Sequence, residues 1–256
     1  MKIVDGKQIA QRILLRLKGE VKRLASKPHL AVVLVGSDPA SLTYIRKKQE
    51  AAAEVGIKFS LYKFPDDIEL SALLSELARI QTQKLSGIIV QLPLPSNLDK
   101  KKVLNQLDPE IDVDFLSWES LGKLVIGENT LVPPAPAAIL EILKYYKVNL
   151  LGKHVVLVGS GDLIGKPLAN ILIQLPVTLT ICRKQTKNLA SYTRRADILI
   201  TGAGQSNLIR GSMVKPGTVV IDAGVSFKGK KMHGDVNFGE VAKKASLITP
   251  TPGGVG

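Results

Sequence analysis

The stretch HVVLVGSGDLIGKP, residues 154–167, joins an apolar run to three glycines and the start of a predicted helix. An apolar run of this kind is typical of a buried parallel strand. Gly159, Gly161 and Gly165 allow close backbone approach, and the N-terminus of the next helix offers unpaired N–H groups to an anion. The GxGxxxG spacing is one residue longer than the usual fingerprint, so a ligand-free strand-to-helix turn stays the alternative. The strand–turn–helix context favours a phosphate-binding loop in a doubly wound domain.

Strand-like and helix-like patterns alternate on both sides of this stretch. Apolar runs such as LAVVLVG and GIIVQL are separated by segments with apolar residues at spacings of three and four. Turn-forming residues interrupt the pattern between Asp108 and Pro136. We therefore predict an α/β protein of two domains, each with a mainly parallel sheet. Residues 1–118 would form an N-terminal α/β catalytic domain, and residues 119–256 a C-terminal Rossmann-like nucleotide-binding domain.

The composition excludes several other classes of protein. The chain has 256 residues, of which 45% are hydrophobic, and this is too apolar for a disordered chain. Its longest apolar runs are far shorter than the ~20 residues that span a bilayer, so we expect no membrane partner. The N-terminus has no apolar signal region, and the single cysteine, Cys182, excludes an internal disulfide or a multi-cysteine zinc site. These features predict a cytoplasmic, metal-free globular protein.

The charge is strongly basic, with 35 Lys and Arg against 22 Asp and Glu, a net +13. Such a balance attracts polyanions, which include nucleotide cofactors, carboxylate-rich small molecules and nucleic acids. Aromatic residues make up only 4% of the chain, and no nucleic-acid-binding motif is present. We therefore expect small anionic ligands and no nucleic acid, and a basic nucleic-acid binder stays the weaker alternative.

The strand after the glycine loop, VTLTIC, ends at Cys182 and is followed by two cations. NAD-binding domains usually have an acidic residue near this position, where it bonds the ribose 2′-hydroxyl. This chain has Arg183 and Lys184 instead, and cations there suit the 2′-phosphate of NADP. The alternative is that both are solvent-exposed loop charges.

Four polar residues of the N-terminal half are candidates for catalysis. Tyr44 and Lys48 are four residues apart on a predicted helix and so share one face. A lysine beside a polar aromatic in a cleft can have a lowered pKa and transfer protons, although a surface lysine would give the same spacing. Gln91 closes a strand and could orient Lys48 or cap a turn. Asp114 of the DVD segment could bond an amino-heterocycle or simply form a turn.

The complete set of motifs is more specific than any one of them. In order along the chain, the motifs are GSDPASLTYIRKK, GIIVQLPLP, DVD, GKL, GSGDLIGKP, TKNL, ADILITGAG, VKPGTVVIDAG, GDVNF and ITPTPGGVG. Together they closely resemble the bifunctional methylenetetrahydrofolate dehydrogenase/methenyltetrahydrofolate cyclohydrolase family over essentially the whole chain.

The resemblance implies two reactions and a role for each candidate residue. Methylene-tetrahydrofolate would be oxidised by NADP⁺ and the product hydrolysed to formyl-tetrahydrofolate, a donor in one-carbon metabolism and purine biosynthesis. Lys48 would move protons, Gln91 would bond it, Tyr44 would line the pterin pocket and Asp114 would hold the pterin amino edge. The implied substrate-binding residues are Tyr44, Gln91, Leu92, Pro93, Asp114, Pro252, Gly253 and Gly254. The implied cofactor-binding residues are Gly159, Ser160, Gly161, Gly165, Arg183 and Lys184.

The resemblance also implies a homodimer assembled through the nucleotide-binding domains, with the last residues returning toward the first domain. The chain departs from the family pattern at Phe115, which replaces the usual glycine, and at Ser160–Gly161, which replace a common Arg–Ser pair. We expect Arg183 and Lys184 to replace the missing arginine. Retention of only one of the two activities, or a non-catalytic nucleotide-binding module, stay alternatives. Family members continue beyond the position of Gly256, which suggests a truncated sequence or a form of reduced stability.

Overall fold

The computed structural model describes residues 1–128, 131–229 and 231–256, and the chain divides into two compact units. The first unit is Gln11–Lys123, and the second unit combines Met1–Ala10 with Leu124–Gly256. Two helices, α1 (Gly6–Lys22) and α5 (Trp118–Ile126), each begin in one unit and end in the other. The predicted two-part α/β class is confirmed, while the boundary at 118/119 stays a prediction.

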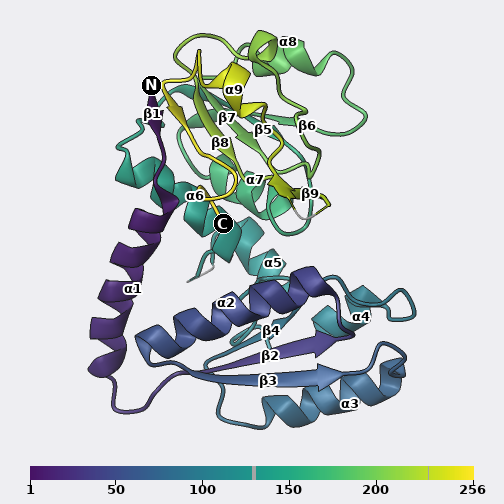
Figure 1. Cartoon of the computed structure of the whole chain (residues 1–256). Helices are drawn as coiled ribbons and strands as arrows, with labels where there is room; N and C mark the ends of the chain where they lie inside the picture. The colour runs from purple at the N-terminus through teal and green to yellow at the C-terminus, as the bar shows by residue number, and fades with distance from the viewer. Residues whose placement is uncertain (129–130, 230) are drawn as a thin grey trace. The chain divides into compact units, whose positions relative to one another are not determined.

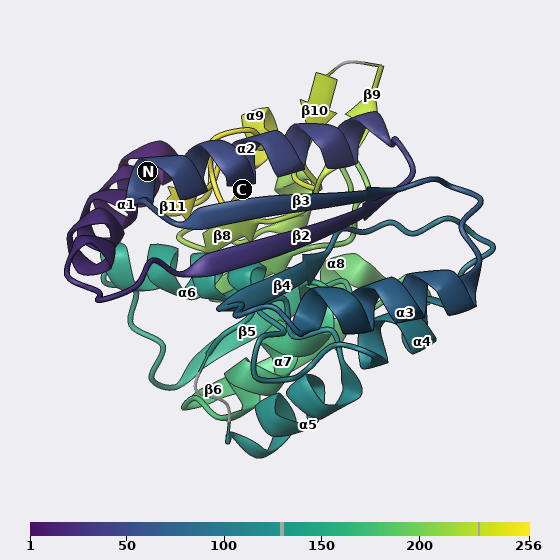
Figure 2. The same ribbon diagram turned by 90° about the horizontal axis from the view of Figure 1, so that it is seen from below.

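The first unit has a three-stranded parallel sheet in the order β3-β2-β4, which Figure 2 shows side by side. Its helices cover both faces of the sheet (Figure 1). The bounds are β2 (His29–Val35), α2 (Pro39–Val55), β3 (Lys58–Phe64), α3 (Leu70–Gln81), β4 (Gly87–Val90) and α4 (Lys100–Asn105).

Alternate residues of β2 pack against different helices, because successive side chains of a strand point to opposite faces. Val32 and Leu34 pack with Ile45 of α2. Val33 and its odd-numbered neighbours pack with α3 and α4, where Leu77 is fully buried. Burial of both faces explains the continuous apolar run of this strand.

The ends of α2 are set by local sequence. The Asp38 carboxylate accepts a 2.7 Å hydrogen bond from the Ser41 N–H, and Pro39 fills the first helical turn, where its missing N–H costs nothing. Gly56 ends the helix in the left-handed conformation at φ 87°. The helix that carries Tyr44 and Lys48 is therefore fixed at both ends.

The second unit has a six-stranded parallel sheet in the order β1-β11-β8-β7-β5-β6 and an antiparallel β9–β10 hairpin. The strands are β1 (Lys2–Ile3), β5 (Lys153–Val158), β6 (Val177–Cys182), β7 (Ile198–Thr201), β8 (Val219–Asp222), β9 (Ser226–Lys228), β10 (Lys231–His233) and β11 (Leu247–Ile248). The helices are α6 (Pro134–Tyr145), α7 (Gly165–Ile173), α8 (Leu189–Thr193), the 3₁₀ turn η1 (Gly211–Met213) and α9 (Phe238–Val241).

The strand order creates a switch point beside β5. The chain passes from β5 to β6 on one side and then to β7 on the other side of β5. In doubly wound sheets, ligands bind at the carboxyl ends of strands where the order reverses in this way. The loops after β5 and β7 therefore border the expected ligand site, which is where the glycine loop lies.

The segment between Asp108 and Pro136 differs from the sequence prediction, because α5 lies inside the expected break. The Trp118 N–H at its start donates to the Asn105 side chain at 2.7 Å, and the Ser120 N–H donates to the Ser117 hydroxyl at 3.2 Å. The capping serine was the available signal. The β9–β10 hairpin and the two-residue strand β1 were also not predicted. Over the described residues, no helix is both long enough and apolar enough to cross a bilayer.

Candidate active site

In the first unit, the structure brings Lys48 and Gln91 together at the carboxyl end of β4. The Lys48 ammonium on α2 donates a 3.1 Å hydrogen bond to Gln91 Oε1. Gln91 directly follows β4, and its N–H donates to the Val33 carbonyl at 2.9 Å, which continues the β2–β4 ladder by one bond. The Gln91 Nε2 amide donates to the Leu92 carbonyl at 2.8 Å. That second bond turns the amide oxygen toward the lysine.

Burial and mutual charge set the protonation of Lys48 and Asp114. Both side chains are half-buried. Burial lowers the pKa of Lys48, and the Asp114 charge partly opposes this change. Burial raises the pKa of Asp114, Lys48 opposes the rise, and the negative charge of Asp112 adds to it. Burial disfavours the charged forms of both side chains. The pKa of Lys48 therefore lies nearer to neutral pH than that of a free lysine, which suits a group that transfers protons.

The remaining candidates of this unit surround the pair. Tyr44 lies one helical turn before Lys48 on α2 and is 36% exposed. The Leu92 carbonyl also accepts a 3.4 Å hydrogen bond from the Ser41 hydroxyl, so α2 holds the loop after β4. Pro93 follows in an exposed position, joined to Leu92 by a cis peptide bond. An acid–base group thus lies beside an exposed loop and an aromatic side chain.

Asp112 is the residue of this region to which sequence reasoning gave no role. It is 2% exposed, and its carboxylate accepts hydrogen bonds from the Leu116 and Ser117 N–H groups. The signal was its position two residues before Asp114 in the DVD segment. Polarity alone did not distinguish a buried, bonded carboxylate from a turn-forming one.

In the second unit, the glycine loop packs too closely for side chains. Gly159 has φ 112°, and a Cβ there would lie 2.5 Å from the Gly202 carbonyl oxygen of the loop after β7. A Cβ on Gly165 would collide with the Gly159 carbonyl, whereas one on Gly161 would meet nothing within 4 Å. The backbone of the loop therefore runs close to the loop after β7 and leads directly into the N-terminus of α7, an arrangement that suits the pyrophosphate of a dinucleotide.

The two predicted cations lie on the neighbouring strand end. Val158 of β5 pairs with Cys182 of β6, and the Gly159 N–H donates to the Cys182 carbonyl at 2.9 Å. Arg183 and Lys184 follow directly and are exposed. The structure thus places both cations next to the glycine loop, where a 2′-phosphate could meet them. Cys182 is fully buried, and burial raises the pKa of its thiol.

Pro252, Gly253 and Gly254 form a tight turn after β11 in the same unit. Gly253 has φ 102°, and its carbonyl accepts a 3.0 Å hydrogen bond from the Gly6 N–H at the start of α1. A Cβ on Gly254 would lie 2.5 Å from the Pro250 carbonyl oxygen. Glycine is therefore required here for the path of the backbone.

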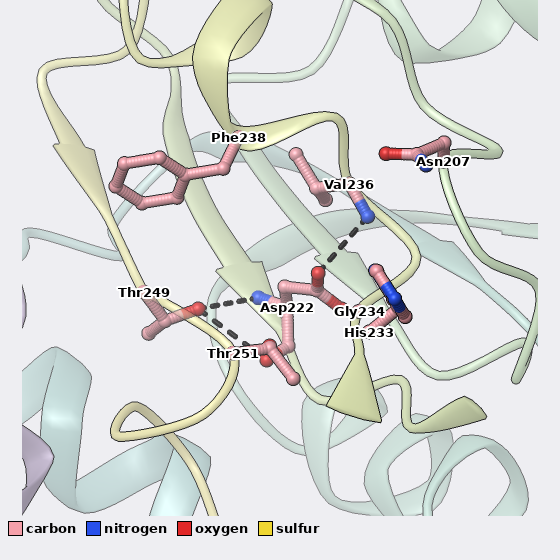
Figure 3. Close-up of a pocket in the computed structure, with 8 residues that line it drawn as sticks. All are labelled: Asn207, Asp222, His233, Gly234, Val236, Phe238, Thr249 and Thr251. Carbon is pink, nitrogen blue, oxygen red and sulfur yellow. Dashed lines mark hydrogen bonds between the residues drawn. The ribbon is translucent and has the colours of Figure 1, made fainter. Parts of the chain in front are cut away.

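A cavity of about 130 Å³ at the carboxyl ends of β8 and β11 contains none of the predicted site residues (Figure 3). Its buried Asp222 accepts hydrogen bonds from the Val236 N–H at 2.9 Å and the Thr201 hydroxyl at 3.0 Å. The Gly224 and Asp235 N–H groups also donate to it, at 3.0 and 3.1 Å. Burial raises the pKa of Asp222. Because so many donors converge on it, this carboxylate ties the loops after β8 together.

Comparison with known proteins gives matches over both units. The tetrahydrofolate dehydrogenase/cyclohydrolase catalytic domain matches residues 4–114, and the NAD(P)-binding domain of the same name matches residues 133–256. The chain is 45% identical to the bifunctional protein FolD of Hydrogenobaculum sp., with 100% of this chain and 93% of that protein covered.

Solved structures agree. The bifunctional enzyme FolD of Campylobacter jejuni has a TM-score of 0.96 and 38% identity, covering 100% of this chain and 93% of that one. The FolD enzyme of Trypanosoma brucei, solved with an NADP cofactor and an inhibitor, has a TM-score of 0.94 and 35% identity, covering 99% and 91%. This chain belongs to the tetrahydrofolate dehydrogenase/cyclohydrolase family.

Proposed function

We propose that this chain oxidises methylene-tetrahydrofolate to methenyl-tetrahydrofolate with NADP⁺ and then hydrolyses the product to formyl-tetrahydrofolate. The observation that carries the proposal is the half-buried Lys48, bonded to Gln91 and coupled to Asp114. Full-length similarity to bifunctional FolD proteins supports both activities.

The oxidation needs positioning more than acid–base help. The methylene carbon lies between two nitrogens whose lone pairs stabilise the cation left by hydride loss, so the orientation of that carbon limits the rate. NADP⁺, when bound, supplies the hydride acceptor. The backbone around Gly159 and Gly165 would hold its pyrophosphate, and Arg183 and Lys184 would pair with its 2′-phosphate.

The hydrolysis moves protons, and Lys48 would transfer them. A water oxygen bonds the methenyl carbon and loses a proton to the Lys48 amine. The same ammonium then returns a proton to the ring nitrogen as its bond to that carbon breaks, and the remaining hydroxyl proton leaves to water as the C=O bond of the formyl group forms. Gln91 Oε1 aims the Lys48 Nζ at one position during both transfers. The Asp114 carboxylate would accept hydrogen bonds from the N–H groups of the pterin ring, and Tyr44 would line the pocket that holds this ring.

The assembly and cellular setting are part of the same proposal. A homodimer through the second unit is supported by β6, which ends its sheet without a further strand among the described residues. Ile181 on that strand is 43% exposed. Exposed apolar side chains on an open sheet edge favour pairing with another chain. A cytoplasmic location is supported by the single cysteine. The formyl product would serve one-carbon transfer, purine biosynthesis included.

The test follows NADPH formation and methenyl-tetrahydrofolate together by absorbance, starting from methylene-tetrahydrofolate. We expect NADPH to form without accumulation of the methenyl compound. Accumulation would show that the hydrolase activity is absent, and no NADPH would contradict the oxidation. Initial rates with NADP⁺ and NAD⁺ test the cofactor choice, and a preference for NAD⁺ would refute the role of Arg183 and Lys184.

A further inference from the structure

Asp112 lies at the junction between the central sheet of the first unit and the loop that carries Asp114. Its backbone forms an isolated parallel bridge with Ile88 of β4. Its side chain is 2% exposed, although an ionised carboxylate is costly to bury unless it is hydrogen-bonded or near a positive charge. The charge of Asp112 is therefore held inside the protein by its hydrogen-bond donors.

The Asp112 carboxylate holds the following turn closed. Oδ2 accepts hydrogen bonds from the N–H groups of Leu116 at 3.0 Å and Ser117 at 2.9 Å. The Phe115 N–H donates to the Asp112 carbonyl at 3.3 Å. These bonds fix both ends of a turn that contains Asp114.

The turn is strained at its centre. Phe115 has φ 56°, a left-handed conformation that bulky side chains rarely adopt, and its side chain is 7% exposed. Such a conformation persists only where the surrounding structure over-determines it, and such residues cluster at functional sites. The two bonds to Asp112 Oδ2 and the burial of the ring supply that constraint, so the direction of the neighbouring Asp114 is set by Asp112.

The second carboxylate oxygen of Asp112, Oδ1, does not bond to the turn. Among the described residues, Oδ1 accepts no hydrogen bond although it is buried. The charges that act on Asp114 come from Lys48 on α2 and from Asp112 on its own turn. Asp112 therefore acts on Asp114 through geometry and through charge.

We propose that Asp112 is a positioning residue for the reaction at Lys48, which fixes the strained turn that presents Asp114 to the substrate and places a second negative charge beside it. The inference rests on the proposed function, because it assigns Asp112 to the same substrate site.

The test uses Asp112→Asn, which keeps an oxygen acceptor for both N–H groups and removes the charge. The matched control is Asp108→Asn, since Asp108 caps the Glu110 N–H at 2.9 Å on an exposed turn of the same segment. Carboxyl ¹³C NMR, with Asp114 assigned by its Asn variant, reports the pKa of Asp114. Steady-state kinetics report kcat and KM for the folate substrate against pH.

In Asp112→Asn, we expect the pKa of Asp114 to fall and the acidic limb of the KM profile to move to lower pH. In Asp112→Ala, which also removes the acceptor, we expect KM for the folate substrate to rise about tenfold with a smaller change in kcat. An Asp114 titration and KM profile in Asp112→Asn that match the Asp108→Asn control would overturn the proposal.

Phe115→Gly provides a test that does not alter either carboxylate. Glycine adopts the left-handed conformation without strain, so the bonds to Asp112 should still hold the turn and we expect the KM for the folate substrate to stay close to the parent value. A large rise in KM in a folded variant would show that the ring of Phe115 holds the turn, and it would contradict the positioning role of Asp112. If the parent enzyme shows neither activity, the proposed function fails. The NMR titration would still decide whether Asp112 acts on Asp114.

Discussion

Replacement of Lys48 by methionine should separate the two activities. Methionine keeps most of the length and apolar volume of the lysine stem but removes the ammonium, which donates to Gln91 Oε1 at 3.1 Å. The hydrolysis then loses the group proposed to accept and return a proton. The oxidation loses only a neighbour of the substrate, because hydride transfer needs no proton at this position.

The size of the effect follows from the role. A positioned acid–base group contributes about 10²–10⁴-fold to a rate. At about 1.4 kcal/mol per tenfold, the hydrolysis barrier should rise by about 3–5.5 kcal/mol. The oxidation should change by less than about tenfold, since the lost contact is comparable to one hydrogen bond of about 1 kcal/mol.

The assay supplies methenyl-tetrahydrofolate directly and follows its absorbance, while NADPH formation from methylene-tetrahydrofolate is measured separately. Lys47→Met is the matched control, because Lys47 is exposed and lies on the same helix. We expect Lys47→Met to keep both rates and Lys48→Met to accumulate the methenyl compound. A folded Lys48→Met variant with a parental hydrolysis rate would refute the reasoning.

The stability of the same variant provides an independent check on the direction in which burial shifts the pKa of Lys48. Burial lowers the pKa of Lys48 in the folded state, so the folded protein binds this proton less tightly than the unfolded chain does. Burial of the charged Lys48 therefore destabilises the folded protein. This destabilisation is fully present below the pKa of Lys48 in the folded state, where the lysine is protonated in both states. It disappears as the pH rises through the ordinary lysine pKa. Lys48→Met should therefore unfold at a higher temperature than the parent at neutral pH, with a smaller difference at high pH.

Three further changes have defined outcomes. Gln91→Leu should lower the hydrolysis kcat about tenfold by releasing Lys48, and a parental kcat would contradict the aiming role. Gly165→Ala should destabilise the fold by about 1–3 kcal/mol in denaturant titration, whereas Gly161→Ala, with open space around its Cβ, should not, and equal effects would contradict the packing argument. Phe115→Gly relieves about 1–2 kcal/mol of strain but loses about 3–5 kcal/mol of aromatic packing, so a net loss of about 2 kcal/mol is expected by thermal unfolding, and an unchanged Tm would contradict it.

Much of the fold could be read from local patterns. The apolar run of β2 predicted a buried strand, and Gly159, Gly161 and Gly165 predicted the turn that leads into α7. In both cases the information lies within a few residues, because strand and helix periods repeat at two and 3.6 residues. The α5 helix was missed, since its short apolar pattern lies among turn-forming residues.

The candidate site depended on contacts between distant segments. The sequence and its resemblance singled out Lys48, Gln91 and Asp114, but the bond between Lys48 and Gln91 joins residues 43 positions apart. That bond depends on the register of β4 with β2. Val90 pairs with Val33, so Gln91 comes directly after the last paired residue of β4. The lowered pKa of Lys48 also arises from burial, which no local pattern encodes.

The sequence by itself determined the two-part α/β class, the glycine loop and the residue types available for chemistry, since each depends on residues near one another in the chain. It also determined the family, since the order of the motifs along the chain needs no knowledge of their contacts. Only the tertiary structure decided that Gly159 and Gly165 must lack side chains, because the colliding carbonyls belong to Gly202 and Gly159. It also decided that Asp112 is buried beneath the turn of Asp114. Steric exclusion and desolvation depend on what surrounds a residue in space, and folding alone brings those neighbours together.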